Sequence, residues 1–367
     1  MRIDIATLFT QMCGSVLNES IVGRGIRNGF IEVHTHDIRK YTENKHHRVD
    51  DKPYGGGTGM LMQAQPVYDC ISAIKSQGEG KPRIIYMSPQ GEVLTQQKVQ
   101  ELAQEPWLIL LCGHYEGIDQ RVLDELEVEE LSVGNYVLTG GELPALIVAD
   151  AVARLQPGVL PNEDAYSIES HYNGLLEFPQ YTRPEEWHGR RVPEVLLTGD
   201  HRTVTEWQNR EALRVTAKKR PDMYGKFIAE QHERLWSAFL EDKDIPPETR
   251  CSGVVRFGKT ADEADRLAKL VMRGKKRADI SVQPGELPRR GEYLIVTDGA
   301  GLGKCVVQVF NVKTVPFSGV TEVMCGFTAE CSSPDEWRAV QEADISAETP
   351  VAFWQFRLVY KYHKEER

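Results

Sequence analysis

The sequence predicts an α/β protein with a buried parallel β-sheet in its N-terminal half, and two observations support this. First, strand-like segments at residues 83–87, 107–112 and 127–133 alternate with segments of helical spacing such as 95–104. This alternation is typical of parallel sheets, whose strands are covered by helices on both faces. Second, a glycine-bearing loop follows each strand-like segment. In open α/β folds the loops at the carboxyl ends of the strands bind the ligand.

The first 36 residues contain two predicted strands and one predicted helix. Residues 2–8 alternate like a strand, residues 16–26 have helical spacing, and residues 29–36 form a second strand. His34 and His36 would lie on the same face of this second strand. Because no third ligand lies nearby in the sequence, we expect no metal site there.

Two glycine-rich stretches are candidates for ligand loops. Residues 50–60 contain paired carboxylates and four glycines but lack the Lys-Ser/Thr ending of a phosphate loop, so a lid over a site and a long surface loop are both open. Residues 132–144 combine glycines, where bare backbone can approach a ligand, with an apolar wall at 136–138. This stretch leads into a predicted helix at 143–155 with Pro144 near its start. Its alternative reading is a glycine-rich turn without a ligand.

Composition predicts a soluble globular protein of two or three domains in a reducing compartment. The 367 residues are 41% hydrophobic and 27% charged, which is ample for packed cores. No apolar run reaches about 18 residues, and Asp4 falls where a signal peptide needs its apolar core, so we expect neither a membrane span nor secretion. The seven cysteines form no Cys-x-x-Cys pair, which favours reduced thiols in the cytoplasm over disulfides or a zinc site.

Any nucleic-acid site must be a local patch, because the net charge of −10 opposes binding of a polyanion. The best candidate is a predicted helix at residues 203–219. Arg210, Arg214 and Lys218 recur there at four-residue spacing and share one face. An ordinary solvated helix face has the same pattern, so the stripe by itself does not decide between the two.

Four motifs together resemble those of a known family. They are Val-Asp-Asp-Lys-Pro-Tyr-Gly-Gly-Gly-Thr-Gly-Met at 49–60, Ser-Pro-Gln-Gly at 88–91, Gly-His-Tyr-Glu-Gly-Ile-Asp at 113–119 and Gly-Asn-Tyr-Val-Leu-Thr-Gly-Gly-Glu-Leu-Pro at 134–144. In this order they resemble the bacterial tRNA (guanine-N1)-methyltransferases of the TrmD family, which belong to the SPOUT class. Shorter matches at 157–160, 181–184 and 195–201 extend the resemblance over roughly residues 1–226.

The resemblance implies a deep trefoil knot, an obligate homodimer and S-adenosylmethionine bound at the knot. The implied reaction transfers a methyl group to the N1 atom of guanine at tRNA position 37, next to the anticodon. Guanine N1 carries a proton, so the reaction needs a base and a group that stabilises charge on O6. Arg154 matches the family's arginine for the second role, and Glu116 is also implied at the site. The sequence leaves open whether Mg²⁺ assists.

The resemblance also implies which residues bind the cofactor and the tRNA. The cofactor contacts would come from Ser88, Pro89, Gly91, Gly113, Gly117, Ser132, Val133, Gly134, Tyr136, Leu138, Gly140, Gly141 and Pro144. The tRNA contacts would come from Asp50, Tyr115, Arg183, Arg210, Arg214 and Lys218.

At three positions the sequence departs from the family pattern. The family's base is the aspartate of an Asp-Ser pair, and Glu169 stands there in this chain. Glutamate has nearly the same intrinsic pKa, so we predict that Glu169 is the base, although one extra methylene displaces its carboxylate. Asn135 and Glu177 also replace aspartates. These departures leave one alternative open, a catalytically weakened or inactive tRNA-binding protein of the same fold.

The last 140 residues or so resemble an ASCH domain, a small β-barrel of the PUA-like group associated with RNA binding. The resemblance rests on Phe257-Gly258 between two helices, Gly-Lys-Lys-Arg at 274–277, and strands at 293–297, 304–312 and 352–360. Residues 253–260 match a phosphate-loop expression, but a strand followed by a Thr260–Glu263 capping box explains them better. Lys275, Lys276 and Arg277 are predicted RNA contacts, and a basic helix end is the alternative.

Four segments are therefore predicted. They are a SPOUT methyltransferase domain (1–160), a linker (161–174), a small helical tRNA-binding domain (175–227) and an ASCH-like α+β RNA-binding domain (228–367).

Overall fold

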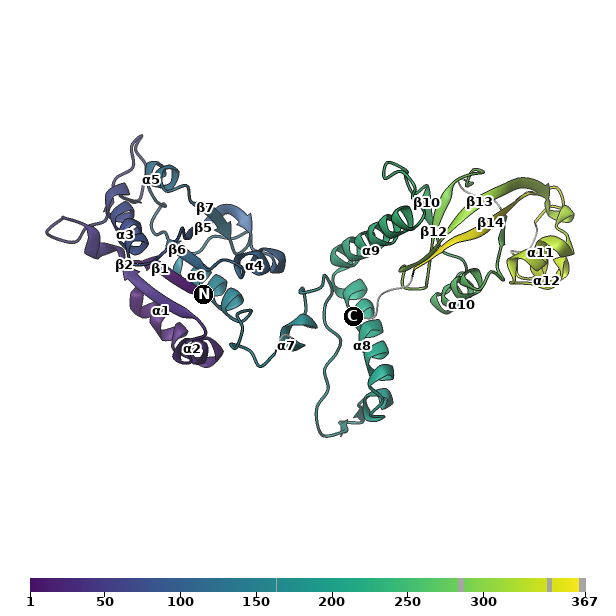
Figure 1. Cartoon of the computed structure of the whole chain (residues 1–367), viewed down its shortest axis with the longest axis horizontal. Helices are drawn as coiled ribbons and strands as arrows, with labels where there is room; N and C mark the ends of the chain where they lie inside the picture. Colours follow the sequence, from purple (N-terminus) through teal and green to yellow (C-terminus); the bar gives the residue numbers. More distant parts are fainter. Residues whose placement is uncertain (163, 283–286, 342–344, 363–367) are drawn as a thin grey trace. The chain divides into compact units, whose positions relative to one another are not determined.

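The computed structural model describes residues 1–162, 164–282, 287–341 and 345–362. The chain forms two compact units, residues 1–173 and residues 174–367 (Figure 1). Among the described residues no helix is both long enough and apolar enough to cross a membrane.

The first unit is built on a five-stranded parallel sheet, which confirms the predicted fold class. The strand order is β2-β1-β6-β5-β7 (Figure 1). The strands are β1 (Arg2–Thr7), β2 (Glu32–Asp37), β5 (Arg83–Val93), β6 (Trp107–Cys112) and β7 (Glu129–Ser132). All six residues of β6 are buried, as expected for a central strand covered on both faces.

Helices cover both faces of this sheet. On one face lie α1 (Thr10–Leu17), α2 (Ser20–Arg27), α4 (Gln96–Leu102) and α6 (Glu142–Ala153). On the other lie η1 (Ile38–Tyr41), α3 (Ala64–Ser76) and α5 (Gln120–Glu125). The prediction of one helix over 16–26 was wrong, because the chain turns between α1 and α2. Gly23 permits this corner, since a Cβ there would lie 2.2 Å from the carbonyl oxygen of Asn18.

Two predicted loops contain regular structure. β5 continues through residues 88–91 to Val93 and pairs with β7 again after a register shift beyond Met87. The stretch at 50–60 begins with the short strand β3 (Asp50–Asp51), which pairs antiparallel with β4 (Leu61–Met62). Past the sheet, α7 (Asp164–Ser167) is a single turn.

The second unit contains two long helices and a mixed, curled sheet of order β10-β12-β13-β14-β11 (Figure 1). Only β10 and β12 are parallel neighbours, and the other pairs are antiparallel. The strands are β10 (Gly253–Val255), β11 (Ala278–Val282), β12 (Tyr293–Thr297), β13 (Gly303–Pro316) and β14 (Pro350–Lys361). The remaining elements are β8 (Glu186–Trp187), β9 (Arg190–Arg191), η2 (Glu194–Leu197), α8 (His201–Lys219), α9 (Pro221–Asp242), α10 (Ala261–Met272), η3 (Phe317–Gly319), α11 (Glu322–Thr328) and α12 (Pro334–Ala339).

Helix α9 crosses the predicted boundary between residues 227 and 228. Its C-terminal half packs Leu235 and Phe239 against Ile295 on one face of the sheet, while α10 covers the opposite face. The sheet therefore takes part of its core from a helix that begins beside α8.

Residues 253–260 form a strand and a helix cap, as the sequence indicated. Gly253–Val255 is β10, and the Thr260 hydroxyl accepts a hydrogen bond from the backbone N–H of Glu263 at the start of α10. The Glu263 carboxylate accepts from the Thr260 backbone N–H in return, which completes the capping box. A phosphate-binding loop would need a different backbone here.

Candidate active site

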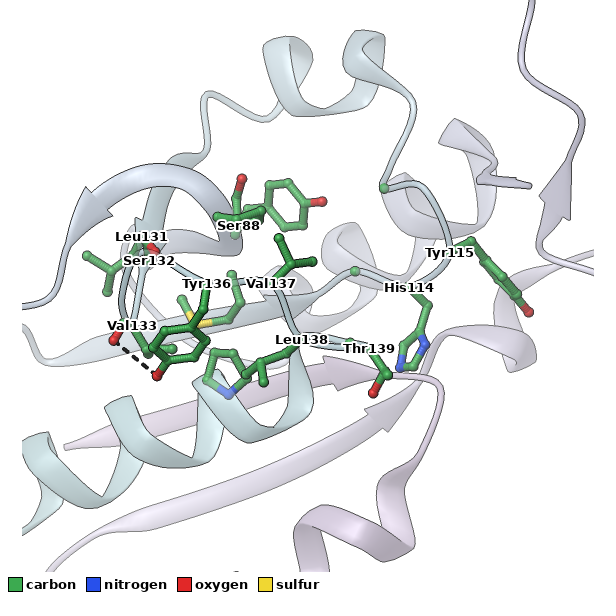
Figure 2. Close-up of a pocket in the computed structure, with 18 of the residues that line it drawn as sticks. Ser88, His114, Tyr115, Leu131, Ser132, Val133, Tyr136, Val137, Leu138 and Thr139 are labelled. Carbon is green, nitrogen blue, oxygen red and sulfur yellow. Dashed lines mark hydrogen bonds between the residues drawn. The ribbon is translucent and has the colours of Figure 1, made fainter. Parts of the chain in front are cut away.

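A pocket lies at the carboxyl edge of the parallel sheet, where the loops after β6 and β7 and the bent middle of β5 meet (Figure 2). The structure brings eleven of the thirteen predicted cofactor contacts into its lining, namely Ser88, Pro89, Gly113, Gly117, Ser132, Val133, Tyr136, Leu138, Gly140, Gly141 and Pro144. Four of the lining residues are glycines, which leave the main chain accessible there, and the side chains of Tyr136, Val137 and Leu138 form an apolar wall (Figure 2). Main-chain donors and acceptors beside an apolar wall suit a purine nucleoside, which needs edge contacts and a flat apolar surface.

The glycines of the pocket occur where the backbone of one loop lies too close to a neighbouring segment to leave room for a side chain. A Cβ at Gly141 would lie 2.7 Å from Cα of Cys112. The N–H of Gly141 donates to the carbonyl oxygen of Gly113 at 2.9 Å, so the loops after β6 and β7 are in direct contact. A Cβ at Gly113 would lie 2.8 Å from the ring of Tyr86. Side chains at these positions would push the loops apart.

Two predicted contacts lie outside the lining, and several lining residues were not predicted. Gly91 packs against the next strand instead, where a Cβ would lie 2.3 Å from the carbonyl carbon of Glu130. Gly134 has φ +154 and lies against the ring of Tyr136. The lining residues that were not among the predicted contacts are Tyr86, Met87, His114, Leu131, Val137 and Thr139, of which Val137 had been assigned only to the apolar wall. Most belong to the strand ends and motifs already quoted, so tracing each loop as a whole would have found them.

Glu116 and Tyr115 lie at the edge of the pocket. The backbone N–H of Glu116 donates to the carbonyl oxygen of Met60 at 3.0 Å. A Cβ at Gly59 would lie 2.4 Å from the Glu116 carboxylate, so the 50–60 stretch packs on this residue. Tyr115 has φ +60 and an exposed side chain (Figure 2). Asp50 begins the short hairpin that carries this stretch toward the pocket.

Arg154 and Glu169 form a forked ion pair. The two Nη atoms of Arg154 lie 2.7 and 2.9 Å from the two carboxylate oxygens of Glu169. The hydrogen bonds to Glu169 raise the pKa of the Arg154 guanidinium further, so it stays charged. Both side chains are about one-third exposed, at 30% and 38%, so the pair is accessible from solvent. The structure thus brings the predicted base and the predicted cation together.

This ion pair and the pocket lie at opposite ends of α6. Gly141 caps the N-terminus of the helix and Arg154 its C-terminus. A helix of 12 residues is about 18 Å long at about 1.5 Å per residue. Within one chain, the predicted catalytic pair therefore does not face the predicted cofactor loops.

The other departures from the family pattern lie on the surface. Asn135 is exposed in the loop after β7, and Glu177 is exposed in the second unit. Nε2 of His36 lies 2.6 Å from the buried carboxylate of Asp4.

The predicted tRNA-binding residues of the second unit are exposed. Arg210, Arg214 and Lys218 share one side of α8, and Arg214 pairs with Glu211 at 2.6 Å. Arg183 is exposed ahead of this helix.

The prediction that Lys276 contacts RNA was wrong, because this lysine is only 1% exposed. Its ammonium group donates to Ala278 O at 3.0 Å, pairs with Asp279 at 3.1 Å and with Glu330, and lies 4.4 Å from the centre of the Phe257 ring. The neighbours Lys275 and Arg277 are exposed.

Comparisons with known proteins agree with the geometry. A family model described as tRNA (Guanine-1)-methyltransferase TrmD matches residues 1–226, and an ASCH domain model matches residues 253–360. A protein of Ruminiclostridium cellulolyticum, described as a tRNA (guanine-N(1)-)-methyltransferase, is 53% identical over 226 residues, which cover 62% of this chain and 97% of the relative. Proteins of the same description from Lachnospira eligens and Anoxybacillus flavithermus are 48% and 47% identical. Each match covers 64% of this chain, with 100% of the first relative and 96% of the second.

Proposed function

Because this chain belongs to the tRNA (guanine-1)-methyltransferase family, and so methylates N1 of guanine in tRNA with S-adenosylmethionine as donor, we propose that its target is the guanine at position 37. The pocket supports the assignment of the S-adenosylmethionine site, because eleven of the thirteen predicted contacts line it. S-adenosylmethionine supplies an electrophilic methyl group when it is bound. The chain also carries a C-terminal ASCH domain.

The ion pair of Arg154 and Glu169 supports their roles in proton transfer. The edge of guanine presents N1–H, a donor, beside O6, an acceptor. A carboxylate beside a guanidinium is the complementary arrangement, because Glu169 accepts from N1–H while Arg154 donates to O6. The bound guanine would replace the internal hydrogen bonds of 2.7 and 2.9 Å with equivalent ones. Glu169 then takes the N1 proton, and Arg154 stabilises the charge that develops on O6.

The length of α6 supports a homodimer with composite sites. The cofactor loops at one end of the helix and the ion pair at the other cannot act on the same base within one chain, so a second copy would supply the missing half. Apolar side chains are exposed on the adjoining helices α1 and α6: Met12 41%, Val16 53%, Leu143 47% and Ile147 46%. We propose that this patch is the subunit contact. The threading of the contacting loops as a trefoil knot is part of the same proposal.

Subunit complementation tests the composite site. Differently tagged Glu169→Gln and Gly141→Ala chains are co-expressed and the heterodimer is isolated. If the site is composite, one of its two sites combines an intact pocket with an intact base, so half of the wild-type activity returns. If each chain holds a complete site, both sites are defective and no activity returns.

Methyl transfer to defined transcripts tests the function itself. Label from S-adenosylmethionine should appear in unmodified tRNA with guanine at position 37 and not in tRNA with adenine there. Glu169→Gln keeps the shape but removes the base, so transfer should fall by at least about a hundredfold. The exposed Glu186→Gln serves as the matched control. Binding of tRNA and cofactor by wild type without transfer would refute the assignment and favour the inactive binding protein.

We propose that Mg²⁺ assists through the tRNA or through exposed carboxylates. In the part of the chain that the structure describes, no group of three His, Cys, Asp or Glu side chains could hold a metal ion. Chelation with EDTA should therefore change the KM for tRNA rather than the affinity for the cofactor. A cytoplasmic location is also proposed, and the seven free cysteines support it.

We propose that the C-terminal domain contacts RNA along α10 and the turn that follows it. Residues 256–277 hold eight basic and three acidic side chains, although the whole chain has net charge −10. Arg266, Lys269 and Arg273 share the exposed face of α10, because Leu267 and Val271 are buried beneath the sheet. Replacing these three residues with glutamate should weaken RNA binding and reduce its salt dependence. The same replacement at Lys243, Arg250 and Lys313 is the control and should have a smaller effect. Equal effects of the two sets would exclude a specific surface.

A further inference from the structure

A buried carboxylate lies beside the cofactor loops and takes no part in the catalytic pair. Glu142, the first residue of α6, is 2% exposed. Its Oε1 accepts a hydrogen bond from the hydroxyl of Thr7 at 2.6 Å, and its Oε2 lies 2.8 Å from Nε2 of His114. Thr7 is the fully buried last residue of β1, and His114 follows β6. One carboxylate therefore joins three segments that are far apart in the sequence.

The joined segments support the wall of the cofactor pocket. His114 and Gly140 both line the pocket, and they form an isolated β-bridge with each other. A Cβ at Gly140 would lie 2.3 Å from Nε2 of His114 and 2.7 Å from Oε2 of Glu142. The backbone of Gly140 thus packs directly on this pair. A displacement of either partner moves the loop between β7 and α6.

A carboxylate suits this position for two physical reasons. Each of its oxygens has a hydrogen-bond partner, as a buried polar group requires. It also lies in the first turn of α6, where the helix dipole favours a negative charge. Burial raises the pKa of the nearby Cys13 thiol to about 11, and the charge of Glu142 adds to this rise.

We propose that Glu142 is a positioning residue of the methyltransferase. Together with Thr7 and His114 it holds the loop of residues 132–141 in the conformation that binds S-adenosylmethionine. Glu142 itself is not among the lining residues of the pocket. The proposal rests on the proposed function only in taking this cofactor as the ligand.

The test measures cofactor affinity separately from turnover. Thr7→Val removes the hydroxyl at constant shape, including its hydrogen bond from the backbone N–H of Phe9 at 2.9 Å, and Glu142→Gln replaces the carboxylate with an amide of the same shape. The control is Glu19→Gln, since Glu19 is an exposed glutamate at the start of α2 that makes no side-chain cap. For both test variants we expect the Kd of S-adenosylhomocysteine by calorimetry, and the KM for S-adenosylmethionine, to rise about tenfold. At saturating cofactor, kcat and the KM for tRNA should stay within about twofold of wild type.

A purely structural role gives the opposite pattern. It lowers the folded, active fraction, so kcat falls and the KM for the cofactor is unchanged. That outcome, or wild-type affinity in both variants, overturns the proposal. If Glu142→Gln does not fold, Thr7→Val still decides, because it leaves the carboxylate paired with His114. Calorimetry measures cofactor binding without any turnover. If the wild-type protein binds the cofactor but does not methylate tRNA, this result contradicts the proposed function and leaves the role of Glu142 open to the same binding test.

Discussion

Gly141 lies where two loops of the cofactor pocket are in contact. We expect Gly141→Ala to push these loops apart without straining the backbone dihedral angles of residue 141 itself. The residue has φ −82 and ψ −6, which alanine adopts without strain. The added Cβ is therefore the only perturbation. It would lie 2.7 Å from Cα of Cys112 and 3.0 Å from the backbone nitrogen of Gly113.

The magnitude follows from these contacts. A carbon pair at 2.7 Å is roughly 1 Å inside the optimal separation, and both neighbours are backbone atoms that cannot rotate away. Such overpacking costs about 1–3 kcal/mol. Separation of the loops also strains the hydrogen bond from Gly141 to Gly113, worth about 0.5–1.5 kcal/mol. We expect a loss of about 2–4 kcal/mol, which lowers the melting temperature of the first unit by several degrees.

Thermal unfolding and calorimetry of S-adenosylhomocysteine binding provide the assay. Gly14→Ala is the matched control, because Gly14 lies in α1 of the same unit and its Cβ would meet nothing closer than 3.9 Å. This control should be neutral or slightly stabilising, since alanine favours the helix. A Gly141→Ala protein with the melting temperature and the cofactor Kd of wild type would show that the loops do not need this close approach.

Three further predictions follow from charge and burial. Replacing Arg210, Arg214 and Lys218 with alanine should weaken binding to tRNA of any sequence and lower the slope of log K against log salt by up to about 3. If the variant and the wild type bind tRNA with equal affinity over a series of salt concentrations, these three residues have no role in binding. Burial by itself would raise the pKa of Asp4, but hydrogen bonds from His36, Arg2 and Trp107 outweigh it and hold that pKa below its usual value. The ionised carboxylate therefore stabilises the fold above the ordinary pKa near about 4 and loses this effect as the pH falls through the lowered value, so urea titrations from pH 7 to pH 3 should show a smaller acid-dependent loss in Asp4→Asn. Five of the seven cysteines are buried, and burial raises the pKa of two of them, Cys70 and Cys305, to about 12. The native protein should therefore react with Ellman's reagent only at the partly exposed Cys251 and Cys331, and all seven thiols should react after denaturation.

The ends of a strand could be predicted from the sequence where the strand is buried on both faces, because its residues then form a continuous apolar run. Trp107–Cys112 and Tyr293–Thr297 have the predicted ends, because each is a nearly continuous apolar run, the first between Pro106 and Gly113 and the second between Glu292 and Asp298. The corner between α1 and α2 was missed because it depends on a backbone contact between Asn18 and Gly23. Hydrophobic spacing continues across that corner, so a periodicity argument does not detect it.

The catalytic site was only partly open to prediction. The resemblance implied eleven of the residues that line the pocket, and the glycine-bearing loops after parallel strands predicted only that a ligand site lies at this edge of the sheet. The role of Glu142 was missed, since its partners Thr7 and His114 are 135 and 28 residues away in the chain. Lys276 was misplaced for a similar reason. Its partner Glu330 comes from a distant helix end, and a basic run in a sequence carries no information about which of its members is buried.

The sequence by itself determined the fold class, the family and the chemical groups available to the reaction, because these depend on local pattern and residue type. The tertiary structure alone decided which groups meet. It pairs Arg154 with Glu169, separates that pair from the cofactor loops by the length of α6, and buries Lys276 while leaving Lys275 exposed. Contacts between segments far apart in the chain have no periodic signature, and their energies depend on distances that only the folded chain defines.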